Sequence, residues 1–249
     1  MSSTLIHGDT EALLVDVPIT IDQARRVAEW VKGFGRQLVG VYITHAHGDH
    51  WYGTSTLLEH FPDATVYATE GVIDEMRKAT PDGRPNPRYA ALFPGKLSDT
   101  PVVARPVPSG GLRVDGQVLD AVEVGHSDTD STTVLHVPSI GLVVAGDVIY
   151  NNVHQSVREG GGGGLRTWMD AAGIVASLNP QHVVAGHKDP ARGDDLAIIA
   201  ETREYLLAVE EILAGEPTRD EFFYRVIERF PGRLNTTTVS YSSLQLIPG

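Results

Sequence analysis

The sequence contains no cysteine, few methionines and tryptophans, and no long apolar run. Without cysteine the protein forms no disulfide, binds no metal through thiolates and has no thiol nucleophile. Apolar segments such as 12–15 and 142–145 fall far short of the ~20 residues that a membrane-spanning helix needs. The N-terminus shows no basic segment followed by an apolar one, so no secretory signal is visible. We therefore expect a cytoplasmic protein with no membrane partner.

Charge and length narrow the class of protein further. The chain has 20 basic and 32 acidic residues and a formal net charge of −12. Because an acidic surface repels phosphate backbones, a small-molecule substrate is favoured over nucleic acid. The 249 residues, 41% of them hydrophobic, fit a single domain over 1–249 with a substantial core. The oligomeric state stays open, with a homodimer as one option.

Short apolar strands and amphipathic helices alternate along the chain. We expect strands at 12–15, 39–43, 65–67, 113–124, 132–137, 141–145 and 182–185, and helices at 20–35, 54–60, 72–79, 167–178, 196–213 and from 218 onward. Thr20 with Gln23, and Thr218 with Glu221, have the spacing of capping boxes. The proline-rich stretch 80–108 predicts a loop, whereas 235–249 fits either helix or strand. Two β-rich halves, each followed by helices, predict an α/β fold with sheets buried between helices.

Three histidines and one aspartate fall within six residues. His45, His47, Asp49 and His50 follow a β-branched strand, and Gly48 permits a sharp turn between them. Neutral imidazoles and a carboxylate are ligands that zinc and similar divalent metals prefer. This segment therefore predicts a metal-binding loop.

Three further candidate ligands share one local setting. His126, Asp147 and His187 each follow a glycine at the end of a predicted strand. Strand ends at one edge of a sheet are where open α/β architectures collect their sites. With the four residues of the loop, the set suffices for two metal ions, with Asp147 able to bridge them.

These motifs, in this order, resemble those of the metallo-β-lactamase superfamily, and the similarity extends over nearly the whole chain. The resemblance implies a four-layer αββα sandwich. It also implies one ion bound by His45, His47 and His126, a second bound by Asp49, His50 and His187, and Asp147 as the bridge. Asp16 matches an aspartate that braces the metal loop in that family. A short strand is also expected at 5–6, and relatives often have a further strand before it, so a truncated start is one expectation.

The resemblance implies a hydrolase with two zinc ions, or with iron or manganese in their place. A metal-bound hydroxide would cleave an ester-like carbonyl bond in a lactone, thioester or ester. Asp147 and the lack of cysteine resemble the glyoxalase II and lactonase branch more than the zinc β-lactamases. The main alternative is an oxidoreductase similar to the mononuclear iron persulfide dioxygenases, and a β-lactamase or phosphodiesterase is less favoured.

Asp49 and Tyr150 are the candidate catalytic residues. N-acyl homoserine lactonases carry a tyrosine at the offset of Tyr150 from the bridging aspartate, where it contacts the substrate carbonyl; simple packing is the alternative. Asp128 and Asp130 depart from the family pattern, and they either cap a turn or contact a polar or cationic substrate group.

Two other segments bear on how a substrate would be bound. The five glycines at 160–164 predict a mobile flap over 151–165 beside the metals. Glyoxalase II binds its thiol carrier with C-terminal helices, but residues 196–230 show no basic cluster for that role.

Overall fold

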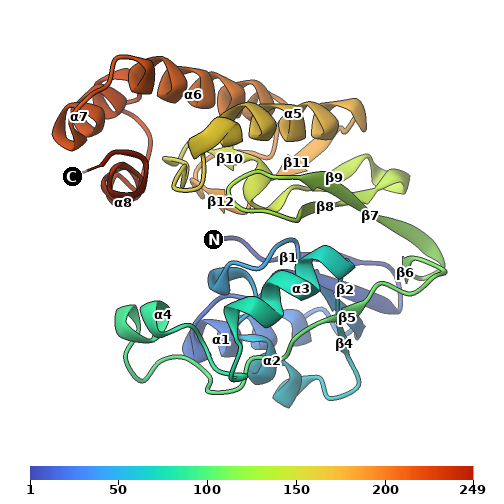
Figure 1. The fold of residues 1–249 in the computed structure, drawn as a ribbon. Coiled ribbons are helices and arrows are strands. Elements are labelled where there is room, and N and C mark those ends of the chain that lie inside the picture. The colour runs from blue at the N-terminus through green and yellow to red at the C-terminus, as the bar shows by residue number, and fades with distance from the viewer. Residues whose placement is uncertain (249) are drawn as a thin grey trace. The chain divides into compact units, whose positions relative to one another are not determined.

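The computed structural model describes residues 1–248 and alternates strands with helices along the chain (Figure 1). It divides into two compact units. Unit 1 comprises Met1–Glu123 and Thr133–Ile140, and unit 2 comprises Val124–Thr132 and the chain from Gly141 onward. Both units combine strands with helices, in line with the two predicted halves. That residues 1–249 form one domain stays a prediction.

Unit 1 is built around a five-stranded sheet. Its strands, in spatial order, are β1 (Thr4–His7), β2 (Glu11–Val15), β3 (Gln37–Tyr42), β4 (Thr65–Ala68) and β5 (Arg105–Pro106). The first pair is antiparallel, and the later neighbours are parallel. Parallel neighbours need crossover connections, which contain α1 (Ile21–Lys32), α2 (Thr54–His60) and α3 (Glu70–Ala79). The core of this unit includes the buried side chains of Trp51, Leu57, Ile73 and Met76.

The helix starts in unit 1 follow local capping chemistry. Thr20 and Gln23 form the predicted capping box of α1, and the predicted helix 54–60 is confirmed as α2. The prediction of a loop over 80–108 is wrong for α4 (Pro87–Leu92). There the Asn86 side chain accepts a hydrogen bond from the Arg88 amide, and a proline at the first helical position is already shaped for a helix.

The predicted single strand 113–124 is wrong, because the chain forms a hairpin there. β6 (Leu112–Val114) and β7 (Gln117–Gly125) are antiparallel. Asp115 and Gly116 connect them with φ values of +46° and +78°. Two-residue hairpin turns of this kind need positive φ at both positions, which an Asp-Gly pair accommodates. The next strand, β8, spans Thr132–Val137.

Unit 2 has short parallel strand pairs and most of the long helices. β9 (Leu142–Val144) pairs with β11 (His182–Val184), and β10 (Tyr150–Asn151) pairs with β12 (His187–Lys188). The helices are α5 (Gly164–Ser177), α6 (Ala197–Ala214), α7 (Arg219–Arg229) and α8 (Thr237–Leu246). Figure 1 shows α5 and α6 side by side. The Thr218–Glu221 capping box is confirmed, and α8 shows that residues 237–246 of the ambiguous C-terminal segment form a helix, while residue 249 lies outside the described residues.

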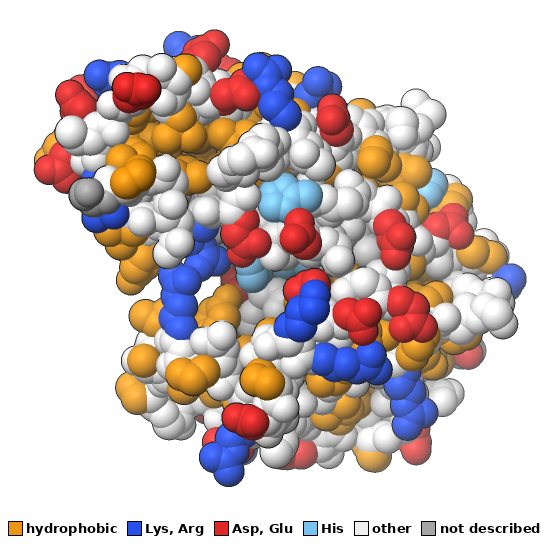
Figure 2. All heavy atoms as spheres, viewed as in Figure 1, with side chains coloured by type: hydrophobic (Ala, Val, Ile, Leu, Met, Phe, Trp, Pro, Cys, Tyr) orange, Lys and Arg blue, Asp and Glu red, His pale blue; other side chains and the backbone are white. Residues whose placement is uncertain are grey.

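The C-terminal helices expose several apolar side chains. Figure 2 shows a group of hydrophobic side chains over this part of unit 2. Leu207 of α6, Tyr224 of α7, and Tyr241 and Leu244 of α8 are all exposed. Exposed apolar side chains are common on protein surfaces. Within residues 1–248, no helix is long and apolar enough to cross a membrane.

Candidate metal-binding residues

The four candidate ligands of unit 1 lie close together after β3. His45 and His50 are fully buried, whereas His47 and Asp49 are partly exposed. The ring centroid of His45 lies 5.0 Å from that of His47 and 4.1 Å from that of His50. A single turn of 3₁₀ helix over Gly48–His50 folds the segment back on itself. The structure thus gathers the three imidazoles that the sequence places in one motif.

Asp16 holds this segment in place through hydrogen bonds. This buried residue has a φ of +59°, and its carboxylate accepts hydrogen bonds from the Thr44 amide at 2.9 Å and the Thr44 hydroxyl at 2.8 Å. His50 Nδ1 lies 2.8 Å from Asp16 Oδ2. A carboxylate at Nδ1 fixes the proton there and places the ring's lone pair on Nε2, the usual arrangement in a metal-binding histidine.

Thr44 extends the influence of Asp16 to a second imidazole. Its hydroxyl hydrogen is donated to Asp16, so its oxygen accepts from His45 Nδ1 at 3.0 Å. His45 therefore also carries its lone pair on Nε2. One buried carboxylate sets the tautomer of two candidate ligands, which supports the bracing role expected for Asp16.

A second set of hydrogen bonds supports Thr44 from β8. The Thr133 hydroxyl donates to the Thr44 carbonyl oxygen at 2.7 Å and accepts from the Tyr42 hydroxyl at 2.7 Å. Burial raises the pKa of the Tyr42 phenol above its ordinary value. The phenol is therefore neutral at physiological pH and remains a donor to Thr133.

In unit 2, His126 follows β7 and is held by an acid. Its Nδ1 lies 2.7 Å from Asp130 Oδ1. Its Nε2 is buried and has no hydrogen-bond partner among the described residues. An imidazole with a carboxylate on one nitrogen and an unpartnered buried second nitrogen fits a metal ligand. Asp130 thus holds a candidate ligand, a contact that the sequence did not predict.

Asp147 and His187 lie together with the candidate catalytic Tyr150. The Tyr150 hydroxyl donates to Asp147 Oδ2 at 2.8 Å, and His187 Nε2 lies 3.3 Å from the same oxygen. The Tyr150 and His187 rings stack with centroids 5.6 Å apart. A Cβ at Gly186 would lie 2.2 Å from Asp147 Oδ1, so this cluster needs a glycine there. The structure gives Tyr150 a contact with a candidate ligand, while its role at a substrate carbonyl stays a prediction.

Asp128 is a candidate that the sequence did not assign to metal. It is 2% exposed, and a carboxylate oxygen lies within 4.8 Å of one from Asp147. The only signal in the sequence was an acidic residue two positions after His126. Buried carboxylates close together favour a shared cation, because like charges repel when both are ionised.

The donor chemistry in each unit fits divalent metals. The candidates offer imidazole nitrogens and carboxylate oxygens, and the hydrogen bonds on His45, His50 and His126 all involve Nδ1. This set suits zinc, iron and manganese.

A comparison with protein families relates these residues to known proteins. The family model described as the metallo-beta-lactamase superfamily matches residues 2–187. The chain belongs to the metallo-β-lactamase superfamily. Among solved structures, the DIM-1 metallo-β-lactamase is similar to this chain. The two are 17% identical with a TM-score of 0.62, and the match covers 82% of this chain and 84% of DIM-1.

A second solved structure supports the same fold. The FIM-1 metallo-β-lactamase from Pseudomonas aeruginosa, in its mono-zinc form, gives 20% identity, a TM-score of 0.59, and coverage of 82% of this chain and 81% of that one. Similarity at this level of identity concerns the fold. The predicted fold class, the metallo-β-lactamase fold, is confirmed.

Curated relatives share only a segment with this superfamily member. A hydroxyacylglutathione hydrolase from Francisella philomiragia is 39% identical over 64 residues, which are 26% of this chain and 24% of that protein. The same enzyme from Gloeothece citriformis is 48% identical over 40 residues, 16% of each chain. The matches thus span about a quarter or less of those relatives.

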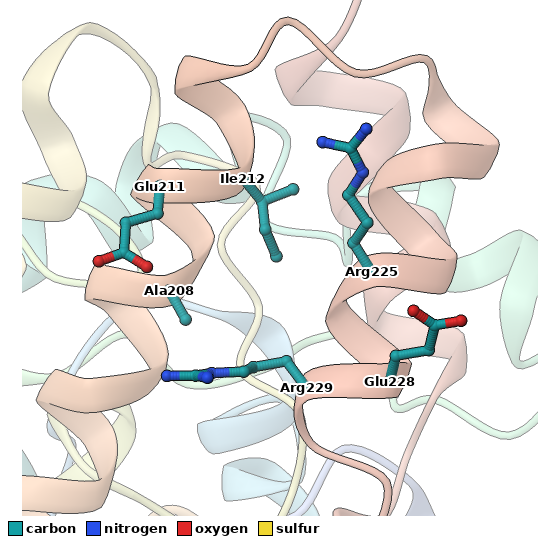
Figure 3. A pocket seen from close by; sticks show the side chains of 6 residues that line it. All are labelled: Ala208, Glu211, Ile212, Arg225, Glu228 and Arg229. Atoms are coloured by element: carbon teal, nitrogen blue, oxygen red, sulfur yellow. The ribbon is translucent and has the colours of Figure 1, made fainter.

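A pocket of about 370 Å³ lies between α6 and α7 (Figure 3). Its lining residues are Ala208, Glu211, Ile212, Arg225, Glu228 and Arg229. Figure 3 shows the Arg229 side chain extending from α7 toward α6. Two arginines and two glutamates line the pocket, so their charges balance and the pocket offers no clear preference for an anionic substrate.

Proposed function

We propose that this chain is a metal-dependent hydrolase that binds two zinc ions and cleaves an ester-like carbonyl bond in a small molecule. The proposed ligands are His45, His47, Asp49, His50, His126, Asp147 and His187. The observation that carries the proposal is the hydrogen bonding of the imidazoles. Asp16 at His50 Nδ1 and Asp130 at His126 Nδ1 leave each Nε2 with the lone pair that a metal needs.

The residues of the chain have distinct parts in the proposed reaction. Bound divalent ions supply Lewis acidity and lower the pKa of water toward 7. Asp49, with a side chain 29% exposed, accepts a proton from the attacking water and passes it to the leaving oxygen or sulfur. The bond from the carbonyl carbon to that leaving atom breaks as the water oxygen is added. Tyr150 donates its single hydroxyl proton to Asp147 Oδ2 in the structure, and it would turn this donor to the oxyanion as negative charge develops there.

Thioesters are the first substrate class to test. The partial similarity to hydroxyacylglutathione hydrolases favours them, and lactones and simple esters share the same carbonyl chemistry. The balanced pocket between α6 and α7 gives no support for binding an anionic thiol carrier there. Iron or manganese in place of zinc, a cytoplasmic location and a homodimer stay predictions.

The test combines metal exchange with a substrate panel. Protein stripped with a chelator is reloaded with Zn²⁺, Mn²⁺ or Fe²⁺ and assayed on thioesters, lactones, esters, a cephalosporin and a phosphodiester. We expect zinc to restore hydrolysis of a thioester, lactone or ester. His182→Ala changes an exposed histidine of β11 outside the proposed ligands, and as a control it should respond to each metal as the unmodified protein does. Oxygen consumption with Fe²⁺ and a persulfide, without hydrolysis, would support the oxidoreductase alternative instead.

A further inference from the structure

Gly164 is the last residue of the glycine run and the first residue of α5. Its φ of −57° and ψ of −36° are ordinary helical values. Alanine adopts this conformation readily and favours a helix by roughly 1 kcal/mol over glycine. The backbone therefore does not require glycine at this position.

The space around Gly164 does require it. A Cβ at this residue would lie 2.8 Å from His126 Nε2 and 2.7 Å from the Glu159 carbonyl oxygen. Both distances are well inside the van der Waals contact distance of about 3.5 Å. His126 Nε2 is the nitrogen proposed to bind metal, because Nδ1 faces Asp130. Any side chain here would displace the nitrogen or the loop.

The other glycines of the run have different reasons to be glycine. Gly162 and Gly163 have φ values of +62° and +96°, a conformation that other residues rarely adopt. At Gly161 no described atom lies within 4 Å of the position that a Cβ would take, and φ is not positive. Gly161 thus provides a control in the same loop, with the same chemical change and no clash.

We propose that Gly164 is a positioning residue for the metal ligand His126. The missing side chain keeps space beside Nε2, and Asp130 holds the opposite nitrogen of the same ring. Together they set where the ring presents its lone pair. This inference rests on the proposed metal-binding function, and it assigns one residue of the glycine run to that function through sterics rather than through flexibility.

The experiment measures Zn²⁺ affinity by competition with a chromophoric chelator. It compares the unmodified protein, Gly164→Ala, Gly161→Ala, His126→Ala and the double variant His126→Ala/Gly164→Ala. We expect Gly164→Ala to lower the affinity for one zinc ion 10–100-fold, which is the range for substitutions of residues that support metal ligands. Gly161→Ala should match the unmodified protein. In the His126→Ala background, adding Gly164→Ala should change nothing further, because the partner through which it acts is gone.

Two results would overturn the inference. One is unchanged affinity in Gly164→Ala; the other is an equal loss with and without His126, which would place the effect in the loop at Glu159. If Gly164→Ala does not fold, as judged by thermal melting without metal, Asp130→Ala tests the same ring from its exposed side. Unchanged affinity there would contradict the positioning of His126. Failure of the unmodified protein to bind Zn²⁺ would instead contradict the proposed function.

Discussion

The proposed ligands of the two units are supported in different ways. In unit 1 four ligands fall within six residues, and the buried Asp16 orders two of their imidazoles, one directly and one through Thr44. In unit 2 three proposed ligands come from separate strand ends, where Asp130 holds His126, and Tyr150 contacts both Asp147 and His187. A compact motif can depend on one residue, whereas dispersed ligands need separate supports. A single substitution should therefore disturb more of the proposed ligands in unit 1 than in unit 2.

Asp16→Ala is the strongest test of this difference. The substitution removes the acceptor of three buried hydrogen bonds and should lower the free energy of unfolding by about 3–5 kcal/mol. It should also weaken the binding of both zinc ions, because His45 and His50 lose their fixed tautomers. Urea unfolding and zinc titration measure the two effects. Asp16→Asn, which tolerates the positive φ, should retain more stability; full zinc binding in Asp16→Ala would contradict the bracing role.

Tyr150→Phe examines one support in unit 2. The variant keeps the ring and removes the hydroxyl that donates to Asp147. If this donor also serves a developing oxyanion, kcat on the active substrate should fall roughly 10²–10³-fold with the metal content unchanged. Steady-state kinetics and elemental analysis separate the roles. Weaker zinc binding with an unchanged kcat at saturating zinc would limit Tyr150 to orienting Asp147.

Thr44→Val tests whether Asp16 acts on His45 through the hydroxyl between them. Valine keeps the shape but removes both the donor to Asp16 and the acceptor for His45 Nδ1. We expect a 10–100-fold loss of zinc affinity. Thr44→Ser, which keeps the hydroxyl, is the control and should bind zinc more tightly than Thr44→Val. Equal affinity in both variants would show that the hydroxyl has no such part.

A smaller effect is expected in unit 2 from His154, which is 1% exposed. Burial, and secondarily Arg233, lowers its pKa to about 4. In the unfolded chain the His154 imidazole takes up a proton at its ordinary pKa of ~6.5, whereas in the folded protein it stays neutral down to about pH 4. The stability that the folded protein has above the unfolded pKa is therefore lost as the pH falls toward 4. We expect a loss on the order of 1–2 kcal/mol between pH 7 and pH 5. Urea unfolding of His154→Asn should show a smaller loss over this range; an identical loss would contradict the assignment.

The fold was predictable where local chemistry decides it. The Thr20 and Thr218 capping boxes mark their helix starts because the cap and its partner lie three residues apart. The hairpin at Asp115–Gly116 was missed because the apolar pattern continues across the turn. α4 was missed because its prolines resemble those of a loop, although one of them occupies a position that favours a helix.

The candidate site was likewise predictable only where the local sequence decides it. The candidate ligands are recognisable because their residue types and order in the sequence are distinctive. The contacts of Tyr150 with Asp147 and of Gly164 with His126 depend on how separate segments pack, which no local pattern encodes. The glycine run predicts flexibility, yet its last residue is constrained by space. Whether residues 151–165 move stays a prediction.

The most direct test of the proposed function is the zinc content of the unmodified protein and of His187→Ala. Elemental analysis after dialysis should give about two equivalents per chain for the unmodified protein and for His182→Ala, and about one for His187→Ala, because a site with few ligands rarely survives the loss of one. Two full equivalents in His187→Ala, or fewer than two in the unmodified protein, would contradict the proposed pair of ions.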